Sequence, residues 1–186
     1  SEVGEIVGKV ADGVDALVEQ AALVSALTRP IAIKSGPADL SQIARKAVDG
    51  QIRNAEERGL KIELNNPDEP IHVVCDPERM QTAISGMIAR GVAAAPPDSV
   101  VEISLGTMDG KAEIEVSDAG PAPDDGRLAS MFDFVGQDRL SSTGLGLALA
   151  RRIVELHGGS VSAKSSDNGD GTTLKIEIPL GDHRAV

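Results

Sequence analysis

The sequence predicts an α+β fold, a two-layer α/β sandwich in which helices cover one face of a mostly antiparallel sheet, preceded by a long N-terminal helix. Three observations support this prediction. Several segments carry apolar residues at steps of three and four, as amphipathic helices do. Others alternate apolar and polar residues, as half-buried strands do. Glycine, proline and aspartate separate the segments, and 186 residues are enough for one domain with an appended element.

The composition limits the classes of function. Hydrophobic residues make up 41% and charged residues 25%, as in ordinary globular proteins. The net charge of −11 argues against nucleic acid and anionic membrane as partners, because a basic patch would supply that affinity. No apolar run approaches the roughly 18 residues that a membrane-spanning helix needs. The single Cys75 allows no internal disulfide and favours a cytoplasmic setting.

The first predicted element is a helix over residues 3–28, whose apolar residues form a coiled-coil-like seam. Pro30 ends it. A seam of this length expects partner helices, so residues 1–30 are predicted to belong to a bundle. Residues 29–37 then form a linker.

The domain proper is predicted over residues 38–181, with a tail at 182–186. Asp39 or Ser41 opens a helix that ends at Gly59, and two short strands follow at 60–64 and 71–74. The buried stripe of that helix comprises Leu40, Ile43, Ala44, Ala47, Val48, Ile52 and Ala55.

The second half begins with Asp76-Pro77, a capping residue followed by proline at the first helical position. That helix continues to Pro96-Pro97. Two alternating strands follow at 101–105 and 112–116, joined by the hairpin signal Asp109-Gly110.

A loop-rich stretch comes next, with a short helix at 127–132. The acidic pair Asp124-Asp125 is interpreted as its cap. A strong helix runs from about Gly146 to Leu156 and ends at Gly158-Gly159. Two last strands flank a polar turn at 167–171.

Four segments carry a resemblance to sensor histidine kinases. Residues 142–150 (STGLGLALA), running on to 156–159 (LHGG), closely resemble the second glycine box of that family. Residues 118–122 (DAGPA) resemble its first glycine box, 171–174 (GTTL) its closing strand, and 76–80 (DPERM) the start of its magnesium-binding helix. The segments follow the family's order from about residue 40 to the end of the chain.

This resemblance implies the Bergerat ATP-binding fold, which gyrase, Hsp90 and MutL share, and a role in cytoplasmic two-component signalling. Residues 1–30 resemble the second helix of the dimerisation stalk. The implied partners are therefore a second copy of the chain, bound through this helix, and a response regulator or other phosphorelay protein.

The residues of the two glycine boxes and the closing strand fit a purine nucleotide. An acid at a strand end can accept a hydrogen bond from the adenine amino group, and a glycine allows the base to approach the backbone. Glycines ahead of a helix leave free N–H groups for phosphate. A threonine hydroxyl from Thr172 or Thr173 would lie near the adenine. The predicted nucleotide-binding residues are Asp118, Gly120, Ala122, Thr143, Gly144, Leu145, Gly146, Thr172 and Thr173.

The chain also departs from the family. Where active members carry two asparagines and a basic residue on the helix after Asp76, this chain has Gly86, Arg90 and Ala93. Arginine has no oxygen with which to bind Mg²⁺. Ala122 stands in place of a glycine, and the lid at 136–142 is short. We therefore expect weak ATP or ADP binding, no bound magnesium, and no catalytic residue that can be assigned.

The usual phosphoacceptor is also missing, because none of His72, His157 and His183 lies on the predicted stalk helix. Either the first stalk helix lies outside these residues, or the protein never had an acceptor. The sequence thus predicts a degenerate histidine-kinase domain, a pseudokinase or regulatory partner. Two alternatives stay open: an active kinase with rebuilt metal geometry, and a non-catalytic interaction module with a closed pocket.

Overall fold

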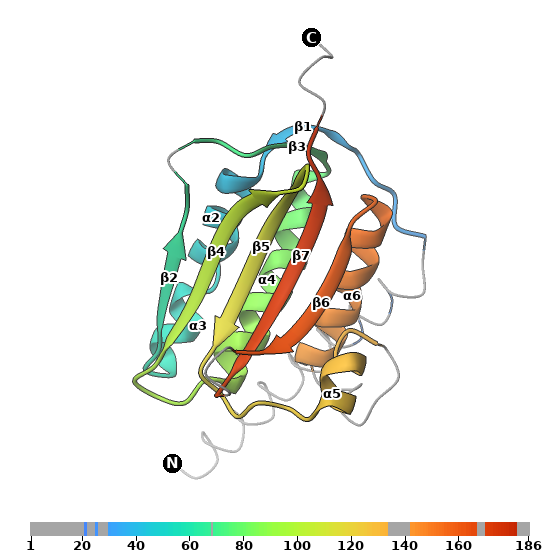
Figure 1. Cartoon of the computed structure of the whole chain (residues 1–186). Coiled ribbons are helices and arrows are strands. Elements are labelled where there is room, and N and C mark those ends of the chain that lie inside the picture. Colours follow the sequence, from blue (N-terminus) through green and yellow to red (C-terminus); the bar gives the residue numbers. More distant parts are fainter. Residues whose placement is uncertain are drawn as a thin grey trace, which may run out of the picture.

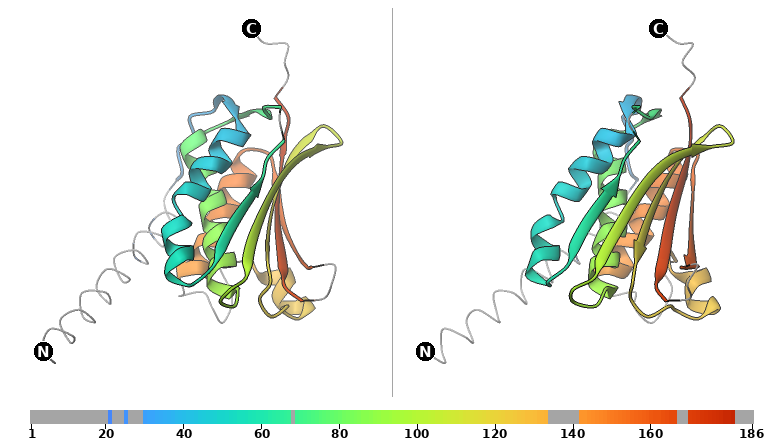
Figure 2. Two further views of the ribbon diagram at one scale, coloured as in Figure 1. Left: turned by 90° about the vertical axis from the view of Figure 1, so that its left-hand side faces the viewer. Right: turned by 60° about the vertical axis from the view of Figure 1, so that its left-hand side comes forward.

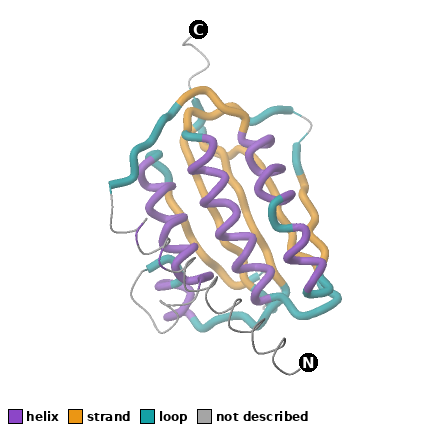
Figure 3. Tube along the Cα trace, turned by 180° about the vertical axis from the view of Figure 1, so that it is seen from behind, coloured by secondary structure: helices purple, strands orange, loops and turns teal. Residues whose placement is uncertain are grey.

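The structure is a computed structural model that describes Ala21, Ser25 and residues 30–67, 69–133, 142–166 and 170–181. Of the predicted stalk segment only Ala21, Ser25 and Pro30 are described, and of the predicted lid only Ser142; the tail at 182–186 lies outside the described residues. The predicted α+β sandwich is confirmed: a five-stranded sheet in the order β2-β4-β5-β7-β6 carries helices on one face (Figure 1, Figure 3). The two layers are clear from the side (Figure 2).

The main sheet is antiparallel except for β2, which runs parallel to β4. A second, two-stranded sheet of β1 and β3 lies at one end of the domain. The strands are β1 (Gly36–Asp39), β2 (Lys61–Asn65), β3 (His72–Cys75), β4 (Val100–Met108), β5 (Lys111–Asp118), β6 (Ser160–Ser165) and β7 (Thr172–Pro179).

The helical layer places α4 between α2 and α6, with α3 continuing from α2 and the short α5 near the end of β6 (Figure 1, Figure 3). The helices are α2 (Leu40–Asp49), α3 (Ile52–Glu57), α4 (Pro77–Ala94), α5 (Asp125–Ser130) and α6 (Ser142–Leu156). None of the described helices is long and apolar enough to cross a membrane.

The core between the layers is aliphatic, as the scarcity of aromatic residues predicts. Phe132 is buried at its margin. Cys75 is fully buried, and burial, together with the charge of Asp76, raises the pKa of its thiol to about 11. The largest fully buried side chains are Leu40, Met80, Ile84, Met87, Ile88, Ile103, Ile114, Leu145, Leu147, Ile153, Leu174 and Ile176.

The first half of the domain departs from the prediction in two places. The helix expected from Asp39 to Gly59 is two helices, because the chain leaves α2 at Gly50, and Ile52 is 40% exposed instead of buried. The expected linker at 29–37 runs into β1, which begins at Gly36 and pairs with β3. Asp39 does cap α2, accepting a hydrogen bond from the Ser41 N–H at 2.9 Å.

The second half follows the sequence signals closely. Asp76 caps α4 through the Arg79 N–H at 3.1 Å, and Asp124 caps α5. Asp109 and Gly110 both adopt positive φ, at 51° and 76°, as a two-residue hairpin of the primed type needs. However, α6 begins at Ser142, four residues earlier than expected, so the glycines of the second box lie inside the helix.

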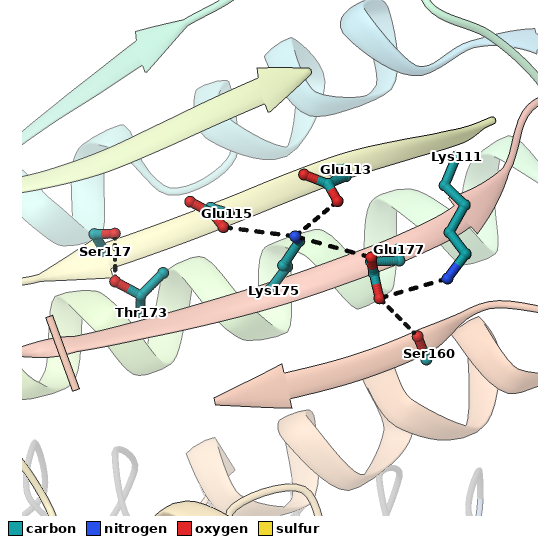
Figure 4. Close-up of polar contacts among 8 residues, drawn as sticks. All are labelled: Lys111, Glu113, Glu115, Ser117, Ser160, Thr173, Lys175 and Glu177. Carbon is teal, nitrogen blue, oxygen red and sulfur yellow. Dashed lines mark hydrogen bonds and ion pairs between the residues drawn. The ribbon is translucent and has the colours of Figure 1, made fainter. Parts of the chain in front are cut away.

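The face of the sheet opposite the helices is polar (Figure 4). The Lys175 ammonium lies 2.7 Å from Glu113, 3.9 Å from Glu115 and 3.8 Å from Glu177. This alternation of charged outer and apolar inner residues is what a sheet with one solvated face requires. Asp118, the residue predicted to contact the purine, is instead buried on the inner, helix-covered face.

Candidate nucleotide site

Asp118 ends β5 with its carboxylate turned into the domain and only 5% exposed. Its Oδ1 accepts a hydrogen bond from the Gly120 N–H at 2.8 Å. Burial raises the pKa of this carboxyl, and the Gly120 N–H, the charge of Arg90 and the backbone of Thr172 act in the opposite direction. A buried carboxylate has more acceptor sites than these bonds occupy, so it can accept a hydrogen bond from a ligand.

Thr172 lies directly across the β5–β7 ladder from Asp118. Its side chain is 1% exposed, and its Oγ1 is buried with no hydrogen-bond partner among the described residues. An unpaired buried hydroxyl is costly, so such a group in a native fold calls for a ligand or an ordered water. A buried carboxylate beside an unpaired hydroxyl fits the polar edge of a purine base.

Thr173, the other threonine that the sequence offered, lies on the opposite face of the sheet. Its Oγ1 is 2.9 Å from the Ser117 Oγ, among the polar residues of the open face (Figure 4). Because side chains alternate along a strand, only one of two consecutive residues can face the pocket. The candidate site therefore contains Thr172 and not Thr173.

Two glycines surround Asp118 for reasons of close packing. A Cβ on Gly120 would lie 2.5 Å from the Ala94 carbonyl oxygen, and one on Gly171 would lie 2.0 Å from the Asp118 carbonyl oxygen. Gly171 also has φ of 111°, which only glycine adopts readily. These contacts fix Asp118 between the end of α4 and the start of β7.

The last turns of α4 run beside Asp118. A Cβ on Gly91 would lie 3.7 Å from the Asp118 Cβ, and the neighbouring Arg90 is half-buried. The charge of Arg90 also acts to lower the pKa of Asp118. From Gly86 to Ala94, Arg90 is the one polar side chain of the helix, and no side chain there carries oxygen.

The N-terminal part of α6 packs against α4 through backbone. A Cβ on Gly86 would lie 3.0 Å from the Gly146 carbonyl oxygen, closer than side chains normally approach. This contact favours glycine at position 86 of α4, whereas a Cβ on Gly146 of α6 would meet only the Gly86 Cα at 3.7 Å, an ordinary contact. Gly144 is half-buried and Leu145 is part of the buried interior. Thr143 belongs to α6, and its side chain lies outside the described residues.

Two of the positions singled out from the sequence are exposed, unlike the buried residues around Asp118. Ala122 and Ala93 are exposed, and the Ala93 carbonyl accepts a hydrogen bond from Arg58 Nη2 at 3.2 Å. The structure thus brings Asp118, Gly120 and Thr172 together next to Arg90. Apart from Ser142, the lid falls in residues that the structure does not describe.

Magnesium does not fit the residues present. Mg²⁺ requires oxygen ligands, usually from one or two carboxylates or amides together with phosphate. The corresponding stretch of α4 offers none, and its one polar side chain is a cation. Within the described residues, no three His, Cys, Asp or Glu side chains are grouped to hold a metal ion.

Sequence reasoning missed the contacts of Asp76. Besides capping α4, its Oδ2 accepts a hydrogen bond from the Lys34 N–H at 2.8 Å, and its own N–H donates to His157 Nε2 at 2.9 Å. His157 Nδ1 lies 2.7 Å from the Ile153 carbonyl oxygen. Asp76 therefore ties the linker, α4 and α6 together. The Asp-Pro pair signals the cap, and nothing in the sequence signals the linker contact.

Comparison with known proteins agrees with this geometry. Residues 75–182 match the family of histidine kinase-, DNA gyrase B- and HSP90-like ATPases. The sensor histidine kinase ZraS of Escherichia coli strain K12 is 22% identical over 179 residues, which are 96% of this chain and 38% of ZraS. The chain thus spans well under half the length of this curated relative.

Solved histidine kinases share the fold. Full-length ShkA in complex with AMPPNP superposes with a TM-score of 0.82 at 22% identity, covering 100% of this chain and 40% of ShkA. ThkA in complex with the response regulator TrrA gives a TM-score of 0.81 at 15% identity, covering 98% of this chain and 53% of ThkA. With the family match over residues 75–182, these likenesses show that the chain belongs to the histidine kinase-, DNA gyrase B- and HSP90-like ATPases and carries a histidine-kinase-type ATPase domain.

Proposed function

We propose that this chain is a degenerate histidine-kinase domain of two-component signalling, which binds adenine nucleotide weakly and acts as a pseudokinase or regulatory partner in a phosphorelay. One observation carries the proposal. The stretch of α4 that should hold the metal has no side-chain oxygen between Gly86 and Ala94, and Arg90 occupies it. Asp118 and Thr172, in contrast, retain a buried carboxylate and a buried hydroxyl that can form hydrogen bonds with a purine base.

The physical reason is the charge balance of phosphoryl transfer. Catalysis of this reaction depends on positioning and on neutralising the charge that develops on the phosphoryl oxygens, and bound magnesium supplies most of that charge. A guanidinium brings one positive charge instead of two and cannot coordinate the oxygens as a metal does. A site without a metal ligand can therefore retain a nucleotide and still fail at transfer.

The proposed partners follow from the family. Residues 1–30 would form the second stalk helix and pair with a second copy of the chain, and a response regulator would dock on the assembled protein, as TrrA does on ThkA. The domain would occupy residues 38–181, with a tail at 182–186, and would work in the cytoplasm. The seam of apolar residues between 3 and 28 supports the pairing.

The test is a phosphoryl-transfer assay with the full chain. The chain is mixed with an acceptor stalk from an active histidine kinase and labelled ATP in the presence of magnesium. We expect no transfer by the parent and a gain of magnesium-dependent nucleotide binding in the triple variant Gly86→Asn, Arg90→Asn, Ala93→Lys. Because any side chain added at Gly86 would press on the Gly146 carbonyl, Arg90→Asn alone is measured beside it. Transfer by the parent would establish an active kinase instead.

A second candidate is supported by the position of Arg90 beside Gly91, the residue that packs against Asp118. If the guanidinium pairs with this carboxylate, the pocket is closed and the chain is a non-catalytic interaction module. The same assays separate the two. Absence of nucleotide binding in the parent, together with binding in the Arg90→Asn variant that magnesium does not enhance, would establish the closed pocket.

A further inference from the structure

We propose that the pocket takes an adenine nucleotide as the free anion, without a divalent cation, and that the Arg90 guanidinium contacts its phosphates in place of the metal. This inference rests on the proposed function, because it names the ligand of the same site. It concerns a property that sets this chain apart from an ATPase domain that works with magnesium.

The first argument concerns Asp118 and Thr172, the two residues proposed to contact the base. Thr172 is 1% exposed, and its Oγ1 has no hydrogen-bond partner in the described part of the chain. Asp118 is 5% exposed and can accept further hydrogen bonds. Both belong to the adjoining ends of β5 and β7, directly paired across the ladder. Such groups stay in a fold at a cost to stability, so they point to a ligand that satisfies them.

The second argument concerns the place of Arg90 on α4. Residues four apart lie on the same face of a helix, so Arg90 is one turn along from Gly86, which touches the backbone of Gly146 in α6. On its other side, the next residue, Gly91, packs against Asp118. Arg90 thus lies between the N-terminal part of α6 and Asp118. The phosphates of a nucleotide whose base is held by Asp118 would extend toward this position.

The chemistry of that position excludes the metal and suits the anion. A guanidinium is always charged, and its planar set of N–H donors matches phosphate oxygens. Magnesium bound to the phosphates would place two further positive charges beside Arg90, where the side chains of α4 from Gly86 to Ala94 offer no oxygen to ligate them. The free nucleotide therefore matches the site better than its magnesium complex.

The experiment is a calorimetric titration of the full chain with ADP and with adenosine, each in excess magnesium chloride and in EDTA. We expect ADP to bind in EDTA at least as tightly as in magnesium. We expect Arg90→Ala to weaken ADP by about tenfold or more, because a charge-assisted hydrogen bond is lost, and to leave adenosine unchanged within about twofold. Arg90→Lys, which keeps the charge and loses the fork, should fall between. Arg79→Ala, an exposed arginine at the other end of α4, is the matched control. A thermal melt of each variant checks that it is folded.

Three results would overturn the inference. A clear gain in ADP affinity on adding magnesium would show a metal site, and if the parent still transfers no phosphoryl group, the proposed function would survive this failure. ADP binding that is unchanged in Arg90→Ala would show that the arginine does not touch the phosphates. No binding of ADP or adenosine by the parent would show that the pocket has no nucleotide role.

Discussion

The unpaired hydroxyl of Thr172 gives the sharpest test of the candidate site. The change is Thr172→Val, which replaces a buried hydroxyl with a methyl group of nearly the same shape. Because Oγ1 has no partner among the described residues, the variant removes a desolvation cost and no internal hydrogen bond. We expect the free energy of unfolding to stay the same or to rise by about 1 kcal/mol, which would raise Tm by about 2–4 °C in a chain of this size.

Nucleotide binding should respond in the opposite direction. If the hydroxyl contacts the base, Thr172→Val loses a hydrogen bond with a net value of about 0.5–1.5 kcal/mol, so adenosine and ADP should bind about twofold to thirteenfold more weakly. Urea unfolding of the free protein and calorimetry with ADP measure the two effects. A variant that is stabler and binds less well is what a ligand-contacting hydroxyl predicts.

Thr173→Val is the control on the adjacent residue. Its hydroxyl bonds to Ser117 on the open face, so the variant should lose about 0.5–1 kcal/mol of stability and bind nucleotide as the parent does. The reasoning would be refuted if Thr172→Val destabilised the free protein by more than about 1 kcal/mol, because the hydroxyl would then have a partner within the fold.

Three further predictions follow from the surroundings of Asp118 and Asp76. Gly171→Ala should destabilise the fold by about 2–4 kcal/mol, because the new Cβ meets a backbone oxygen at positive φ. Gly106→Ala, where a Cβ meets nothing within 4 Å, should stay within about 0.5 kcal/mol of the parent in the same urea titration. Asp76→Ala should lose about 2 kcal/mol, because two backbone N–H groups lose their acceptor. The Lys34 N–H lowers the pKa of Asp76 below its ordinary 3.8, so this stabilisation is present above that pH and is lost as the pH falls through the lowered value. The difference between parent and variant should therefore shrink in acid, and a constant difference would contradict the assignment. Burial raises the pKa of Asp118, so its carboxylate is lost at a higher pH than an ordinary aspartate's. Nucleotide affinity, measured by calorimetry from neutral to acidic pH, should fall accordingly, and Asp118→Asn should flatten the profile at weaker affinity.

Much of the fold follows from local signals in the sequence. The caps at Asp76 and Asp124, the Asp109-Gly110 turn and the glycines that end α6 each satisfy backbone requirements that do not depend on the rest of the molecule. The sequence also indicates which of the two threonines of β7 lies on the inner face of the sheet. Continuing the alternation of Leu174 and Ile176 backwards puts Thr172, and not Thr173, on the inner side.

Other features depend on contacts between distant segments. The strand β1 forms because β3 lies next to it, and nothing in the composition of residues 36–39 favours a strand. The helix α6 starts at Ser142 and packs closely on α4 at Gly86, although Gly144 and Gly146 by themselves argue for a loop. The bond from the Lys34 N–H to Asp76 crosses 42 positions of sequence, so no local pattern could predict it.

The packing of α4 also distinguishes Gly86 from Arg90, the two positions of this helix at which the family has asparagines. The α4 face that meets Gly146 is too close for a side chain at Gly86, so restoring an amide there requires α6 to shift by a few tenths of an ångström. Arg90, one turn away and half-buried, carries no such restriction. The two departures are therefore not equivalent. Gly86 is restricted by the packing of α4 on α6, whereas Arg90 has the proposed role of a charge next to the phosphates. Replacing Arg90 alone should therefore alter ligand binding with little change in the fold.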